Sequence, residues 1–158
     1  MWGKVLYISQ AGTSGYANAA KGHIYDLIKN KVKVKWETFD CGDVQFTENC
    51  EFDQYIAKAK KILIDSFDTT ILHSTPDLWQ SLIEDFEVKS KIIIGRTVWE
   101  FEKLMPEWVE AINNSSVTHI SVPTEWNKKC FVNSGVTKPI LVDPHIYVDF
   151  PHQHHSLD

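Results

Sequence analysis

Short apolar runs alternate with helical patterns along almost the whole chain. Val5–Ile8 and Ile92–Gly95 are continuously apolar, as strands buried on both faces of a sheet are. Val32–Trp36 alternates between apolar and polar residues, which predicts a strand nearer a sheet edge. Three further segments are predicted as strands: Thr69–His73, Val117–Val122 and Pro139–Val142.

The segments between these strands carry apolar residues at helical spacing. The first predicted helix has Ser14 as its N-cap and places on one face Ala17, Ala20, Ile24, Leu27 and Ile28. A second helix is predicted from the spacing of Ile56, Ala59, Leu63 and Phe67. Pro76 and Pro106 each open a helix, a position that proline favours, and Thr124–Asn133 is helical with Gly135 as its C-cap. Residues 40–50 are predicted as a loop.

Strands that alternate with helices predict βαβ units and a mostly parallel sheet. At 158 residues, one domain is expected. The fold class is therefore α/β, a single Rossmann-like domain over residues 1–149, with residues 150–158 as a tail or linker.

Charge and cysteine content narrow the classes of function. A net charge of −5 argues against non-specific affinity for nucleic acid and disfavours purely electrostatic binding to an anionic membrane. The three cysteines are odd in number and form no C-x-x-C pair, so we expect idle thiols in a reducing compartment. The N-terminus lacks a signal-peptide pattern and no stretch reaches the ~20 apolar residues of a membrane span. We expect a cytoplasmic protein.

The turn after the first strand is the first candidate site, because parallel sheets bind ligands beyond the carboxyl ends of their strands. It comprises Gly12, Thr13, Ser14, Gly15 and Tyr16. Glycines let a backbone approach a ligand, and N–H groups at a helix start favour an anion such as a phosphate. The turn lacks the G-x-G-x-x-G pattern, so no dinucleotide fingerprint is present. The alternative is a tight turn with no ligand.

Two further candidates follow predicted strands. His73 is the candidate catalytic residue, since at a strand end it could donate to a hydroxyl or a phosphate oxygen; a structural histidine is the alternative. In the segment Thr97–Glu100, Thr97 lines the site, Trp99 could stack on a sugar and Glu100 could accept hydrogen bonds from sugar hydroxyls. An ordinary core tryptophan and a solvated glutamate are the alternatives.

Four late histidines raise the question of a metal: His145, His152, His154 and His155. A Pro-containing tail does not hold ligands in a preformed geometry, so we predict no metal site. No spacing indicates a Ser-His-Asp or Cys-His arrangement either.

The order of several landmarks resembles the N-terminal domain of GT-B glycosyltransferases of the group 1, family-4-like type. The similarity spans residues 4–149, and its landmarks are Gly12–Ala17, Ile71–Pro76 with Trp79, Thr97–Glu100, Pro106–Trp108, Val122–Trp126 and Pro139–Pro144. The resemblance implies an acceptor-side domain that works with a nucleotide-sugar donor and no other cofactor. It implies that the turn at Gly12–Tyr16 lies near the donor phosphates, that His73 lies by the donor sugar, and that Thr97–Glu100 line the acceptor side.

In that family the nucleotide-sugar site lies in a second, C-terminal domain, for which this sequence has no counterpart. We therefore expect little or no turnover by the chain alone, with a second domain or a partner chain completing the enzyme. The alternative is a non-catalytic module that binds a glycan or a partner protein. Self-association through an exposed cleft face is a further possibility.

Overall fold

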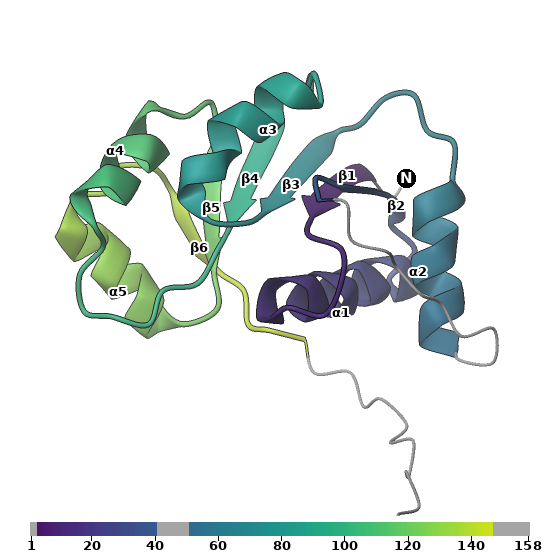
Figure 1. The fold of residues 1–158 in the computed structure, drawn as a ribbon, viewed down its shortest axis with the longest axis horizontal. Coiled ribbons are helices and arrows are strands. Elements are labelled where there is room, and N and C mark those ends of the chain that lie inside the picture. Colours follow the sequence, from purple (N-terminus) through teal and green to yellow (C-terminus); the bar gives the residue numbers. More distant parts are fainter. Residues whose placement is uncertain (1–2, 41–50, 147–158) are drawn as a thin grey trace, which may run out of the picture.

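A computed structural model describes residues 3–40 and 51–146, which form an α/β domain (Figure 1). The sheet of these residues has six strands in the order β2-β1-β3-β4-β5-β6, and every neighbouring pair is parallel. The strands are β1 (Lys4–Ser9), β2 (Lys33–Thr38), β3 (Thr69–His73), β4 (Ile92–Arg96), β5 (His119–Val122) and β6 (Ile140–Val142). The helices are α1 (Gly15–Lys29), α2 (Glu51–Lys61), α3 (Trp79–Asp85), α4 (Pro106–Asn114) and α5 (Glu125–Ser134), with a 3-10 turn, η1 (Pro76–Leu78).

The predicted Rossmann-like α/β class is confirmed, and the sheet is wholly rather than mostly parallel. The predicted edge position of β2 is also confirmed. Ser14 caps α1 by accepting a hydrogen bond from the Ala17 amide, and Gly135 ends α5 with a φ of 103°. The predicted tail at 150–158, and all of the predicted loop at 40–50 except Asp40, lie outside the described residues.

The predicted boundaries of the second helix and of the fifth strand are wrong. The second helix ends at Lys61 and does not reach Phe67, so Leu63 lies in an extended connection with 95% of its surface exposed. The helical spacing of Leu63 and Phe67 is coincidental, because this connection must return the chain to β3, where the Lys4 amide donates to Asp68. The fifth strand begins at His119 rather than Val117.

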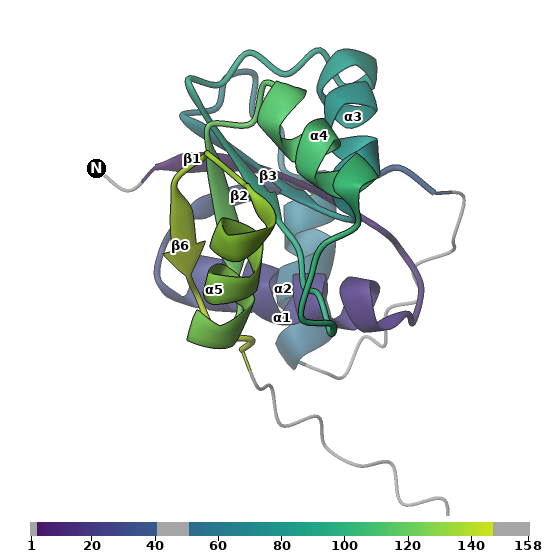
Figure 2. The ribbon, with the colours of Figure 1, turned by 90° about the vertical axis from the view of Figure 1, so that its left-hand side faces the viewer.

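Helices cover both faces of the sheet, and each face has its own core. On the α1 face, α1 and α2 pack on Tyr7, Trp36 and Ile71. On the α3 face, α3, α4 and α5 pack on alternate residues such as Leu72 and Ile120. Figures 1 and 2 show α1 and α2 together on one side, with α3 on the other.

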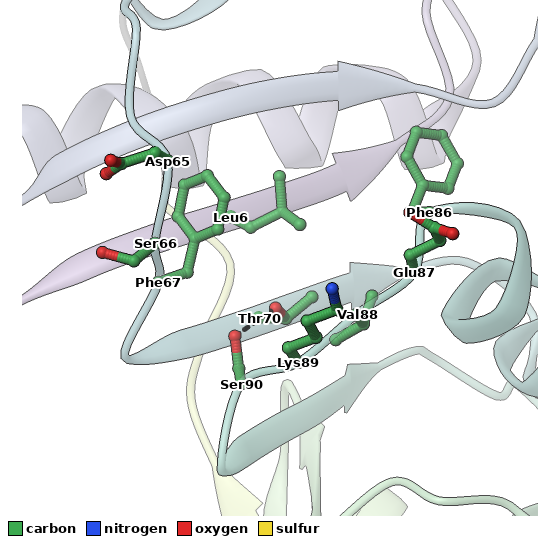
Figure 3. A pocket seen from close by; sticks show the side chains of 10 residues that line it. All are labelled: Leu6, Asp65, Ser66, Phe67, Thr70, Phe86, Glu87, Val88, Lys89 and Ser90. Atoms are coloured by element: carbon green, nitrogen blue, oxygen red, sulfur yellow. Dashed lines mark hydrogen bonds between the residues drawn. The ribbon is translucent and has the colours of Figure 1, made fainter.

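The position of α2 is unusual for a parallel sheet. The chain moves outward from β1 to β2 and back from β2 to β3, yet α1 and α2 share one face. The β2–α2–β3 crossover therefore has the opposite hand from the other four, whereas nearly all such crossovers are right-handed. A right-handed connection would have put α2 on the α3 face. There, a groove of about 370 Å³ remains over Leu6 and Thr70, with Phe67 and Phe86 on either side (Figure 3).

Part of the α1 face is also open. Within the described residues no helix covers β4 to β6 on this side, and Ile92 and Leu141 are 43% and 46% exposed there. A hollow of about 280 Å³ lies over these strands and reaches His23, Arg96 and Asp143.

Candidate functional site

The predicted site segments meet at the carboxyl edge of the sheet. The chain leaves β1 and β3 in opposite directions, so the switch point, where parallel sheets bind ligands, lies between these strands. Tyr16, in the first turn of α1, shares a 2.9 Å hydrogen bond between its Oη and Thr97 Oγ1. Its ring centroid lies 5.6 Å from that of His73. Tyr16, His73 and Thr97 thus join the segments that follow β1, β3 and β4.

The turn after β1 is held by three local features. Gly12 adopts a φ of 81°, a left-handed conformation that favours glycine. Lys21 Nζ donates to the Gly12 carbonyl at 2.6 Å, and the Ala11 amide donates to Asp40 Oδ1 at 2.7 Å. Thr13, Ser14 and Gly15 are exposed at the start of α1. Their proposed contact with a phosphate remains a prediction.

A chain of hydrogen bonds, buried except at Asp143, runs from His73 to the end of the sheet. Tyr7 Oη lies 2.7 Å from His73 Nδ1 and 3.3 Å from His23 Nδ1. His23 Nε2 in turn lies 2.9 Å from Asp143 Oδ2. We call these four residues (His73, Tyr7, His23 and Asp143) the Tyr7 chain. It connects the carboxyl edge between β1 and β3 with the hollow beside β6.

Arg96, the last residue of β4, fixes the Asp143 end of this chain. Its NH1 donates to Asp143 Oδ2 at 2.6 Å and to Ser121 Oγ at 2.8 Å, and its NH2 donates to the Asp143 carbonyl at 3.0 Å. The Arg96 side chain is only 3% exposed, so the Asp143 carboxylate is needed to compensate its buried positive charge. Arg96 Nε is buried without a hydrogen-bond partner in the described part of the chain.

Burial and charge set the protonation of the Tyr7 chain. Burial raises the pKa of Tyr7 above its ordinary value, although the Arg96 charge opposes this, so the phenol keeps its proton. Burial also lowers the pKa of His73 well below 6.5, helped by the charge of Arg96. The hydrogen bond from His23 is the main cause that lowers the pKa of Asp143, and the charge of Arg96 adds to it. His73 is therefore a neutral imidazole and Asp143 a carboxylate at neutral pH.

Trp99 and Glu100 are not drawn into this cluster. The Trp99 ring packs on Trp108 and Phe101 with centroids 4.6 and 5.3 Å away, and its Nε1 donates to the Lys103 carbonyl at 2.7 Å. Trp99 is half-buried, and its proposed stacking on a sugar remains a prediction. Glu100 is exposed and makes no hydrogen bond or ion pair with other described residues.

The connection after β4 is tied along α5. Asn127 Nδ2 donates to the Trp99 carbonyl, Cys130 Sγ donates to the Phe101 carbonyl, and the Leu104 amide donates to Ser134 Oγ. These α5 residues lie at positions i, i+3 and i+7, which share one helix face. The connection is thus held against α5, although Phe101 itself is 66% exposed.

Sequence reasoning missed Tyr7, His23, Arg96 and Asp143 as site residues. Tyr7 is hidden in an apolar strand and His23 in a helical pattern, where neither has a distinctive neighbour. Arg96 gave a weak signal because it directly precedes Thr97. Asp143 stands in the sequence only as part of the last landmark, Pro139–Pro144.

The described residues, 3–40 and 51–146, contain neither a candidate metal-binding group nor a helix that could span a membrane. No group of three or more His, Cys, Asp or Glu side chains in residues 3–40 and 51–146 could hold a metal ion. No helix in the same residues is long and apolar enough to cross a membrane. Comparisons with protein-family models, curated proteins and solved structures gave no match for this chain.

Proposed function

We propose that this chain is the acceptor-side domain of a GT-B-like glycosyltransferase, which transfers a sugar from a nucleotide-activated donor. The observation that carries the proposal is the convergence of Tyr16, His73 and Thr97 at the switch point of a parallel sheet. These residues belong to three separate landmarks of the resemblance. Ligand binding at this edge is the general behaviour of such sheets.

Exposed apolar side chains at the same edge support a role in a larger assembly. Phe101 lies on the connection after β4, and Trp126 lies in the first turn of α5. They are 66% and 48% exposed. Apolar surface of this kind suits a cleft that a second domain closes. We propose that the second domain supplies the remaining contacts to the donor and that transfer is slow without it.

In this proposal the chain contributes positioning and polar contacts. His73 meets a hydroxyl group of the substrate, and Tyr16 and Thr97 hold the neighbouring wall. Fixed groups at a closed cleft contribute to rate because they orient the reactants and need no rearrangement during the reaction.

The test is calorimetric titration of the purified chain with UDP, GDP, UDP-glucose and GDP-mannose. His73→Asn removes Nε2 but keeps a polar atom near Tyr7, and His119→Asn is the matched control at the amino end of β5. We expect binding of one nucleotide class that His73→Asn weakens and His119→Asn leaves unchanged. Equal binding by the wild-type protein, His73→Asn and His119→Asn would contradict the assigned site. Binding of simple sugars without any nucleotide would instead favour a non-catalytic glycan-binding module.

A further inference from the structure

The ring nitrogen of His73 that carries the proton can be deduced by following the Tyr7 chain from its Asp143 end. Asp143 is an acceptor only, since it is a carboxylate that already accepts from Arg96. His23 must therefore donate from Nε2 to Asp143 Oδ2. A neutral His23 then has a lone pair at Nδ1, which can only accept.

The order of donors and acceptors at His23 determines the order at Tyr7 and then at His73. Its phenol has one proton, which it donates to His23 Nδ1 when that nitrogen is an acceptor. Tyr7 Oη must then accept at its shorter contact, the 2.7 Å bond to His73. His73 consequently carries its proton on Nδ1, and its Nε2 presents a lone pair. The bond to Tyr7 is the one hydrogen bond of the His73 side chain within the described residues, so Nε2 is left for a ligand.

We propose that Tyr7, His23 and Asp143 are positioning residues that hold His73 as the Nδ1–H tautomer, so that His73 Nε2 accepts a hydrogen bond from a hydroxyl group of the ligand. A phosphate oxygen is rejected at this nitrogen because both atoms are acceptors. The choice of a hydroxyl rests on the proposed function in one respect only, namely that the ligand is a sugar. The tautomer itself follows from the hydrogen bonds of the Tyr7 chain when His23 is neutral and Asp143 is a carboxylate.

Uptake of one proton reverses the direction of the two hydrogen bonds that join His73, Tyr7 and His23. A proton that arrives at His73 Nε2 allows the Nδ1 proton to pass to Tyr7 Oη, and the phenol proton to pass to His23 Nδ1. The added charge then lies on His23, against the Asp143 carboxylate, and His73 presents an N–H group. The titratable and charged groups around His23 are Tyr7 from β1, His73 from β3, Arg96 from β4, and Asp143 and His145 after β6.

The test is a long-range proton–nitrogen correlation spectrum of the ligand-free, full-length protein with nitrogen-15-labelled histidine. The seven histidines are assigned by single substitutions. At pH 8 we expect His73 to show a protonated Nδ1 and a bare Nε2, and His23 to show the opposite tautomer. A His73 that carries its proton on Nε2 at pH 8 would overturn the proposal.

Tyr7→Phe separates positioning from simple packing, because it keeps the ring and removes the one atom that links the two histidines. We expect the His73 signals to move to the averaged values of a free imidazole while those of His119 stay unchanged. Unchanged His73 signals in a folded Tyr7→Phe protein would contradict the relay. These readouts need no ligand, so a failure of nucleotide-sugar binding would remove the proposed function and leave the tautomer assignment standing.

Discussion

Replacement of His73 by Asn should flatten the dependence of stability on pH. Burial and the charge of Arg96 lower the pKa of His73 well below 6.5, whereas the unfolded chain takes up a proton near that value. The stabilising effect of the neutral, folded His73 is therefore fully present above pH 6.5. It is lost progressively as the pH falls below that value.

The size of this loss follows from proton linkage. With an unfolded pKa of 6.5 and no protonation of folded His73, the free energy of unfolding falls by about 2 kcal/mol between pH 7.5 and pH 5.0. Asp143, whose pKa is also lowered, contributes in the same direction but only at more acid pH, since an ordinary carboxyl titrates near 3.8. His145 has a lowered pKa as well, so the difference between variant and wild type is the quantity that isolates His73.

The assay is urea denaturation followed by circular dichroism at half-unit steps of pH. His73→Asn should lose about 2 kcal/mol of the wild-type pH dependence across this range, whatever its absolute stability. His119→Asn leaves the Tyr7 chain intact and is the control for the loss of a histidine elsewhere in the sheet. If His73→Asn retains the full wild-type dependence, His73 is not the buried neutral group described above.

Two further substitutions test the packing around the site. Gly95→Ala places a Cβ 2.6 Å from three ring atoms of the buried Trp79, so we expect a loss of about 1–3 kcal/mol in urea denaturation. Gly15→Ala, where a Cβ meets nothing within 4 Å, is its control and should not destabilise the protein; equal effects would contradict this account of the β4–α3 contact. Tyr16→Phe removes the bond to Thr97 and the 3.5 Å bond that the Val98 amide donates to Tyr16 Oη, so it should cost about 1 kcal/mol and give faster amide exchange at Thr97 and Val98. Unchanged exchange would show that Tyr16 Oη does not hold the segment after β4.

Most helices and strands could be predicted because residues close together in the sequence determine where they begin and end. Ser14 and Gly135 act as caps through their own side chain and backbone, so their effect is legible in the sequence. The face of the sheet on which α2 lies is decided by tertiary packing, and the spacing of apolar residues within α2 does not encode it. The extended course of Leu63 is likewise imposed by the return to β3.

The candidate site was only partly predictable for the same reason. His73 and Thr97 follow strands, and the carboxyl-edge rule selects such residues without knowledge of their contacts. Tyr7, His23 and Asp143 gain meaning only when β1, α1 and the end of β6 come together. Trp99 also follows a strand, so the same rule selects it, but its ring packs on Trp108 and does not join the cluster of Tyr16, His73 and Thr97.

The most direct test of the central claim is a map of backbone amide shifts when labelled protein is titrated with UDP-glucose and GDP-mannose. The account predicts shifts concentrated at Gly12–Tyr16, His73 and Thr97, and absent from the groove around Leu6 and Phe86 on the α3 face (Figure 3). Shifts confined to that groove would contradict a sugar-transfer site at the carboxyl edge of this sheet.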